Sequence, residues 1–94
     1  MTRAEFVASL NDFDCPKVLS IQMQSLWLDA KGDWHNAHDL IDHLEDPISA
    51  HIHAYLHRVE GDIWNARYWY RKANKEECRA NLKSEWNELV DLYL

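Results

Sequence analysis

The chain has 94 residues, which is enough for one domain with a modest core and too few for two. Its hydrophobic fraction of 47% and its five Trp residues exclude a disordered chain, because burial of large apolar groups offsets the entropy lost on folding. The 10 basic and 16 acidic residues give a net charge of −6, which disfavours a protein that binds nucleic acid phosphates. We expect a single domain over residues 1–94 that folds without a cofactor.

Cysteine usage and hydropathy restrict the class of protein further. Only Cys15 and Cys78 are present, without the Cys-x-x-Cys spacing of a redox motif or a zinc finger, so two free thiols are expected. No apolar run approaches the roughly 18 to 20 residues that a membrane span requires, and the N-terminus lacks the apolar run of a signal peptide. The sequence predicts a cytoplasmic protein with no membrane or nucleic acid partner.

The first elements along the chain are a short helix and a longer one. Thr2 and Glu5 form the pattern of a capping box, which predicts a short N-terminal helix that ends near residues 11–14. Pro16 favours the first turn of a new helix from about residue 17. Apolar residues at helical spacing predict that this helix is buried on two sides: Val18, Ile21, Leu28 on one line and Leu19, Met23, Leu26, Ala30 on another.

A turn of sequence Gly-Asp-x-x-Asn-Ala occurs twice, first at Gly32-Asp33 and again at Gly61-Asp62, 29 residues later. Gly can adopt the left-handed conformation that ends a helix, and the following Asp can cap the next helix. Helix-like apolar patterns flank both copies. The repeat therefore predicts two stacked helical hairpins, over residues 17–45 and 47–74.

The remaining apolar patterns complete the expected fold. In the second hairpin, the first helix is expected to bury the face formed by Ile48, Ile52, Tyr55, Leu56 and Val59. The second helix is expected to bury the face formed by Ile63, Ala66, Tyr70 and Ala73. A closing helix over residues 81–93 is indicated by Leu82, Trp86, Leu89 and Tyr93, with Asn81 as its cap. Residues 74–80 fit either a loop or continuous helix. The fold class predicted is all-α.

The repeated turn resembles the tetratricopeptide-type hairpin, in which Gly-Asp-aromatic is followed by Ala and then by a large residue. The first copy matches with Gly32-Asp33-Trp34, Ala37 and Ile41, and the second with Gly61-Asp62-Ile63, Ala66 and Tyr70. The Trp69–Ala73 stretch is similar to the related Sel1-like repeats, and the segment 53–70 resembles a group of small, functionally uncharacterised bacterial proteins. The resemblance covers roughly residues 18–75.

This resemblance implies a module that binds a protein or peptide on its inner face. The matching positions of the second hairpin are His51, Tyr55 and Arg58, and they provide no clamp for a peptide carboxylate. On the other side, Trp64 and Tyr68 form an aromatic row that could anchor a partner, because Trp and Tyr dominate interface energetics. The alternatives are that this row packs on the closing helix beside Trp86, or that it is buried in a homodimer.

The six His residues suggest a different class of function. His53 and His57 are spaced i, i+4, and Glu60 follows three residues later, which places all three on one helix face. His38 lies in a similar row on the second helix of the first hairpin. A divalent metal such as zinc can use this spacing. The alternative is that these His residues only pack, each with one nitrogen hydrogen-bonded.

Catalysis finds little support in the sequence. Pairs such as Asp39 and His43 offer acid–base groups, but no activated nucleophile or phosphate-binding loop accompanies them. Both Gly residues are used by the hairpin turns. We expect an interaction module rather than an enzyme, with metal binding and homodimer formation as the alternatives.

Overall fold

The computed structural model describes all of residues 1–94 and contains six α-helices and no strand. The helices are α1 (Arg3–Ser9), α2 (Ile21–Ala30), α3 (Trp34–Ile41), α4 (Pro47–Val59), α5 (Ile63–Ala73) and α6 (Leu82–Tyr93). The all-α class predicted from the sequence is confirmed. None of the six helices has the length and apolar character needed to cross a membrane.

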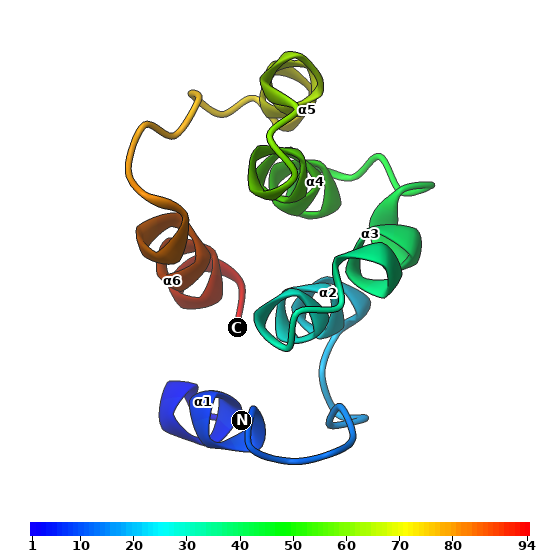
Figure 1. Ribbon diagram of the computed structural model, residues 1–94, viewed down its shortest axis with the longest axis vertical. Helices are drawn as coiled ribbons and strands as arrows, with labels where there is room; N and C mark the ends of the chain where they lie inside the picture. The colour runs from blue at the N-terminus through cyan, green and yellow to red at the C-terminus, as the bar shows by residue number, and fades with distance from the viewer.

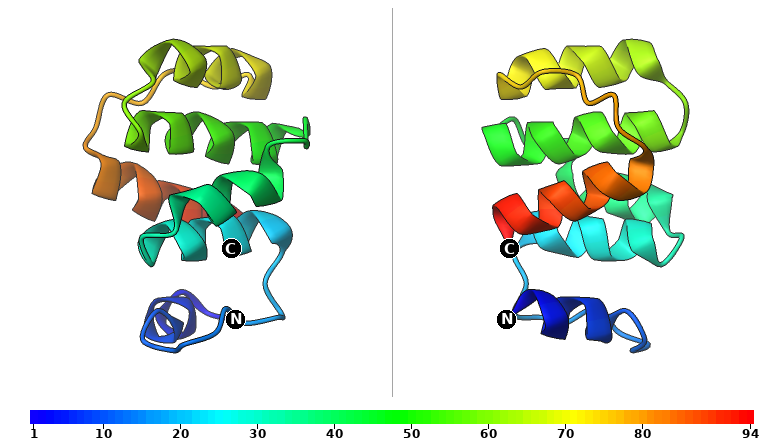
Figure 2. Two further views of the ribbon diagram at one scale, coloured as in Figure 1. Left: turned by 45° about the vertical axis from the view of Figure 1, so that its right-hand side comes forward. Right: turned by 90° about the vertical axis from the view of Figure 1, so that its left-hand side faces the viewer.

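The helices are arranged around a core between α2, α4 and α6. In Figure 1, α5, α4, α2 and α1 follow one another from top to bottom, with α3 to the right and α6 to the left. Helix α2 packs against α3, α4 packs against α5, and α6 lies against both α2 and α4. Figure 2 shows α4 and α5 stacked along their length, with α1 at the opposite end of the molecule. Helix α6 thus closes the side of the core that faces away from α3.

The two Gly-Asp turns have the chemistry that the sequence predicts. Gly32 and Gly61 have φ of 82° and 84°, in the left-handed region. Asp33 and Asp62 cap α3 and α5 by accepting a hydrogen bond from the backbone N–H three residues later. The Asn of the repeated motif adds a second bond, because the Asn65 side chain donates to the other oxygen of Asp62 at 2.6 Å. In both copies of the turn, the two carboxylate oxygens of the Asp accept from the Asn three residues later, one from its backbone and one from its side chain. This pairing explains why Asn occurs together with Asp in both copies of the motif.

Other helix ends confirm some expectations and correct others. The Thr2–Glu5 capping box is present. Helix α2 begins at Ile21 rather than near residue 17, because the Ser20 hydroxyl accepts from the Met23 N–H and caps it there. Val18 lies before the helix and is 80% exposed, so its predicted burial is wrong. Residues 75–79 are not helical, since Asn74 ends α5 with φ of 57°.

The core is built from the middle of each helix. Phe6, Leu26, Ile52 and Leu89 are fully buried and come from α1, α2, α4 and α6. Besides Val18, the exposed residues of the expected lines lie at helix ends: Ile21, Ile48, Ile63 and Leu82 in first turns, and Ala30 in the last turn of α2, where burial was expected. Helix α1 is attached by the Trp27 indole, which donates to the Ser9 hydroxyl at 3.1 Å.

Candidate metal centre

Three of the six His side chains gather where α3 crosses α4. His53 and His57 lie one turn apart on α4 and are 3% and 8% exposed, and the half-buried His38 reaches them from α3. A hydrogen bond that does not involve these His residues also holds the two helices together, because the Trp34 indole on α3 donates to the Leu56 carbonyl on α4 at 2.7 Å. The sequence predicts the His53–His57 pair from its spacing, with Glu60 or His38 as a third ligand, and the structure brings His38 to the pair.

The ring nitrogens are close enough to share one ion. The Nε2 atoms of His38 and His53 lie 2.9 Å apart, and one nitrogen from each of the three rings lies within 4.8 Å of the other two. Zinc bonds of about 2.0–2.1 Å place tetrahedral ligand atoms about 3.3 Å from one another. Movements on the order of 1 Å would bring all three nitrogens to such a separation.

Carboxylates lie beside the Nδ1 atoms of two of these rings. His57 Nδ1 is 2.6 Å from Glu60 Oε1, and His38 Nδ1 is 4.0 Å from Asp42 Oδ2. Glu60 is close enough to accept from His57 Nδ1–H, which fixes the tautomer and leaves the Nε2 lone pair for a metal, whereas 4.0 Å is too long for a hydrogen bond from His38 to Asp42. Glu60, expected among the metal ligands, therefore orients His57 in this structure.

Two Trp residues enclose the cluster. The Trp69 indole from α5 stacks on His53 with ring centroids 3.9 Å apart, and Trp34 stacks on His38 at 4.8 Å. His53 also stacks on His57 at 4.8 Å with 20° between the ring planes. One indole ring therefore covers one face of His53, and the other covers one face of His38.

Two rings of the cluster, His53 and His38, favour the neutral imidazole, which is the form that binds metal. Burial, followed by the charges of His38 and His57, lowers the pKa of His53 to about 3. Burial and the charge of His57 also lower the pKa of His38. His53 Nδ1 is buried and has no hydrogen-bond partner. An unpartnered buried nitrogen is uncommon in folded proteins. It is not the Nε2 atom that faces His38, so no hydrogen bond at Nδ1 fixes the tautomer of His53.

The five residues expected to contact a partner fall into two groups in the structure, those that bond within the chain and those that are exposed. His51 and Tyr55 are buried and bond within the chain, His51 Nδ1 to the Tyr93 hydroxyl at 2.7 Å and Tyr55 to Asp29 at 2.6 Å. Arg58 pairs with Glu85 of α6 at 2.6 Å. Helix α6 therefore covers the inner face that we expected to be open.

Trp64 and Tyr68 lie on the outer face of α5 and are 77% and 43% exposed. They do not pack beside Trp86, which contacts Phe6 and donates to the Leu26 carbonyl. Trp34 and Trp69 also belong to the site, although the sequence pattern of the His residues does not include them. A signal for Trp34 was present, because it precedes His38 by one helical turn, but the stacking of Trp69 depends on how α5 packs on α4.

The fold and the site define a small all-helical protein with a buried three-histidine cluster between two of its helices. Comparison with known protein families, with curated proteins and with solved structures found no match to this chain. The function is therefore inferred from the geometry of the site.

Proposed function

We propose that the chain binds one divalent transition metal ion, zinc in the first place, through His38, His53 and His57. The observation that supports this most is the convergence of three ring nitrogens from two helices within 4.8 Å. Imidazole donors suit zinc, copper or nickel, whereas calcium and magnesium require oxygen ligands. We also propose that the two helix pairs joined by Gly-Asp turns are tetratricopeptide-like and serve as the frame of this site.

The ion would act mainly as a link between α3 and α4. Since the rings of His53 and His57 are stacked 20° from parallel, their lone pairs can meet at one ion only if the two rings rotate apart. Such a rotation would also change the stacking of Trp69 on His53. Metal binding should therefore change the environment of Trp69 and stabilise the folded chain.

Cobalt offers a direct test, because the visible absorption of Co²⁺ reports its ligand number and geometry. We expect tag-free, chelator-treated protein to bind one equivalent of Co²⁺ with a tetrahedral spectrum and a change in Trp fluorescence. The variant His53→Gln should lose both signals, and Glu60→Gln should weaken binding by about 10 to 100-fold through loss of the orienting carboxylate. The matched control His43→Gln, on an exposed ring outside the cluster, should bind as the parent does. A spectrum unchanged by His53→Gln would exclude this site.

A second function, partner binding, is favoured by the exposed aromatic face of α5. Trp64 contributes a large apolar surface there, and Lys72 lies over the Tyr68 ring with its Nζ 5.6 Å from the ring centroid. Exposed Trp and Tyr next to a cation are typical of residues that anchor interfaces. We propose that this face binds a protein or peptide, or a second copy of the chain.

Light scattering separates the two cases for this face. If a second copy covers it, the molar mass should double with rising concentration, and Trp64→Ser should return the protein to a monomer. If the partner is another protein, the parent should stay monomeric and capture it from an extract, while Trp64→Ser should not. A monomer that captures nothing, or captures the same proteins after the substitution, would refute this role.

A further inference from the structure

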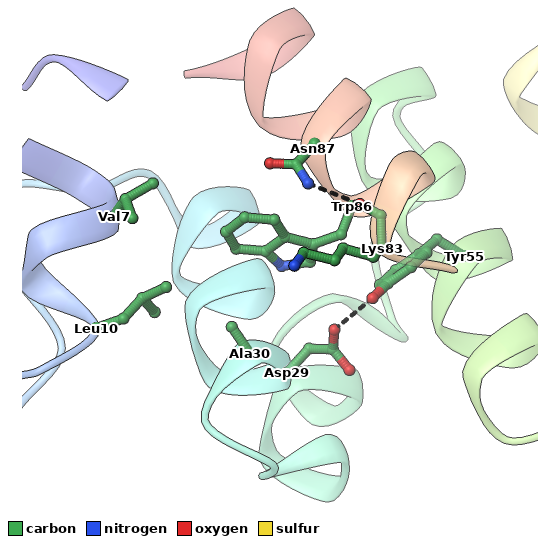
Figure 3. A pocket seen from close by; sticks show the side chains of 8 residues that line it. All are labelled: Val7, Leu10, Asp29, Ala30, Tyr55, Lys83, Trp86 and Asn87. Carbon is green, nitrogen blue, oxygen red and sulfur yellow. Dashed lines mark hydrogen bonds between the residues drawn. The ribbon is translucent and has the colours of Figure 1, made fainter. Parts of the chain in front are cut away.

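A pocket unrelated to the histidine cluster lies where α1, α2, α4 and α6 meet (Figure 3). Its volume is about 420 Å³, within the range of roughly 300–1,000 Å³ that is typical of small-molecule sites. The apolar walls come from Val7 of α1, Leu10 directly after this helix, Ala30 of α2 and Trp86 of α6. The pocket is therefore large enough and apolar enough to bind a small organic group.

Asp29 supplies a carboxylate at the edge of this pocket. It lies in the last turn of α2, where the helix dipole disfavours a negative charge. Its Oδ2 accepts from the Tyr55 hydroxyl at 2.6 Å, as Figure 3 shows, and no Lys, Arg or His nitrogen lies within 4 Å of it. Burial raises the pKa of Asp29. A half-buried carboxylate without a cation, in an unfavourable helix position, is typical of a functional site.

Lys83 supplies the opposite charge on the α6 side of the pocket. Its ammonium group makes no ion pair and no hydrogen bond within the chain, and the residue is exposed. The other polar groups of the wall are already used: the Trp86 indole donates to Leu26, and the Asn87 amide donates to the Lys83 carbonyl. The pocket therefore presents, beside apolar walls, two groups of opposite charge that have no ion-pair partner.

We propose that this pocket binds a free α-amino acid with an apolar side chain. The ligand ammonium would pair with Asp29, its carboxylate would pair with Lys83, and its side chain would lie against Val7, Leu10 and Trp86. An amine without a carboxylate would place its positive charge near that of Lys83 and leave Lys83 unpaired. A carboxylate without an amine would likewise place its negative charge near that of Asp29 and leave Asp29 unpaired. A zwitterion satisfies both charges and is favoured over either.

L-Phenylalanine is the probe for this proposal, measured by calorimetry and by the NMR shift of the Trp86 indole N–H. Chelator-treated protein should be used, because amino acids also coordinate metals and the histidine cluster must not contribute. We expect saturable binding that weakens at least tenfold for N-acetyl-phenylalanine, which lacks the ammonium, and for the methyl ester, which lacks the carboxylate. Equal binding of all three compounds, or no binding at millimolar concentration, would overturn the proposal.

Substitutions locate the binding on this pocket. Asp29→Asn retains an acceptor for Tyr55 and should weaken phenylalanine binding at least tenfold. The control Asp39→Asn, at an exposed residue of α3, should leave phenylalanine binding unchanged. Lys83→Met should have the same effect as Asp29→Asn, with Lys17→Met as its control. Ala30→Leu fills the pocket, leaves both charges in place and should abolish binding. Unchanged affinity in Asp29→Asn and Ala30→Leu would place the ligand elsewhere and refute the assignment.

Discussion

The ion pair between Arg58 of α4 and Glu85 of α6 should be the most sensitive polar contact of the fold. Glu85 is 1% exposed and accepts from Arg58 at 2.6 Å and from the Tyr70 hydroxyl. Arg58→Met would keep most of the side-chain volume but leave a buried carboxylate without its cation. Breaking one partner of a buried pair costs about 3–5 kcal/mol. A domain of 94 residues has a total stability of roughly 5–14 kcal/mol, so this loss would be a large fraction of it.

Urea denaturation followed by circular dichroism measures this effect. The control Arg67→Met removes an exposed cation that pairs with Glu77, and it should cost at most about 1 kcal/mol. The double variant Arg58→Met with Glu85→Leu should recover much of the lost stability, because no buried charge then remains unpaired. If Arg58→Met cost less than about 1 kcal/mol, or if the double variant were no more stable than the single one, the pair would not hold α6 as we infer.

Three further predictions concern single residues. Gly61→Ala should lower the free energy of unfolding by about 1–2 kcal/mol. The backbone φ of Gly61 is 84° and a new Cβ would meet no atom within 4 Å, so the substitution adds only backbone strain. An unchanged thermal melt would contradict this prediction. Burial, followed by the charge of Lys75, lowers the pKa of His51 from 6.5 to about 4. Its protonation in the unfolded chain should therefore reduce stability as the pH falls below 6.5, by at most about 1.4 kcal/mol per pH unit. In metal-free protein, denaturation between pH 6.5 and 4 should show a smaller slope for His51→Gln than for the control His43→Gln, and equal slopes would refute the assignment. Trp64→Ser should change the free energy of unfolding by less than about 0.5 kcal/mol, since Trp64 is an exposed residue, and a larger loss would show that it packs within the fold.

Local chemistry accounts for the parts of the fold that the sequence predicts. The left-handed Gly61, the capping Asp62 and the Thr2–Glu5 box each depend on residues within a few positions of one another, so their patterns could be recognised without a structure. The start of α2 was misplaced because Pro16 suggested an earlier helix start than the one that the Ser20 cap fixes. The capping hydroxyl of Ser20 is therefore a better guide to this helix start than the proline.

The candidate site was only partly predictable, for a similar reason. The i, i+4 spacing places His53 and His57 on one face, but the approach of His38 to 2.9 Å depends on how α3 crosses α4. The inner face was expected to be open because nothing in the local pattern shows that α6 returns to cover Tyr55. That return depends on long-range contacts such as Arg58 with Glu85, 27 residues apart, which periodicity does not encode.

Zinc titration of tag-free, chelator-treated protein tests the central claim most directly, with calorimetry for stoichiometry and thermal melting for stability. We predict one equivalent of Zn²⁺ and, at 100 times the dissociation constant, a stabilisation of about 2.7 kcal/mol. His53→Gln should abolish both effects, and His43→Gln should preserve them. Absence of zinc binding by the parent protein, or equal binding by His53→Gln, would contradict the assignment of His38, His53 and His57 as a metal centre.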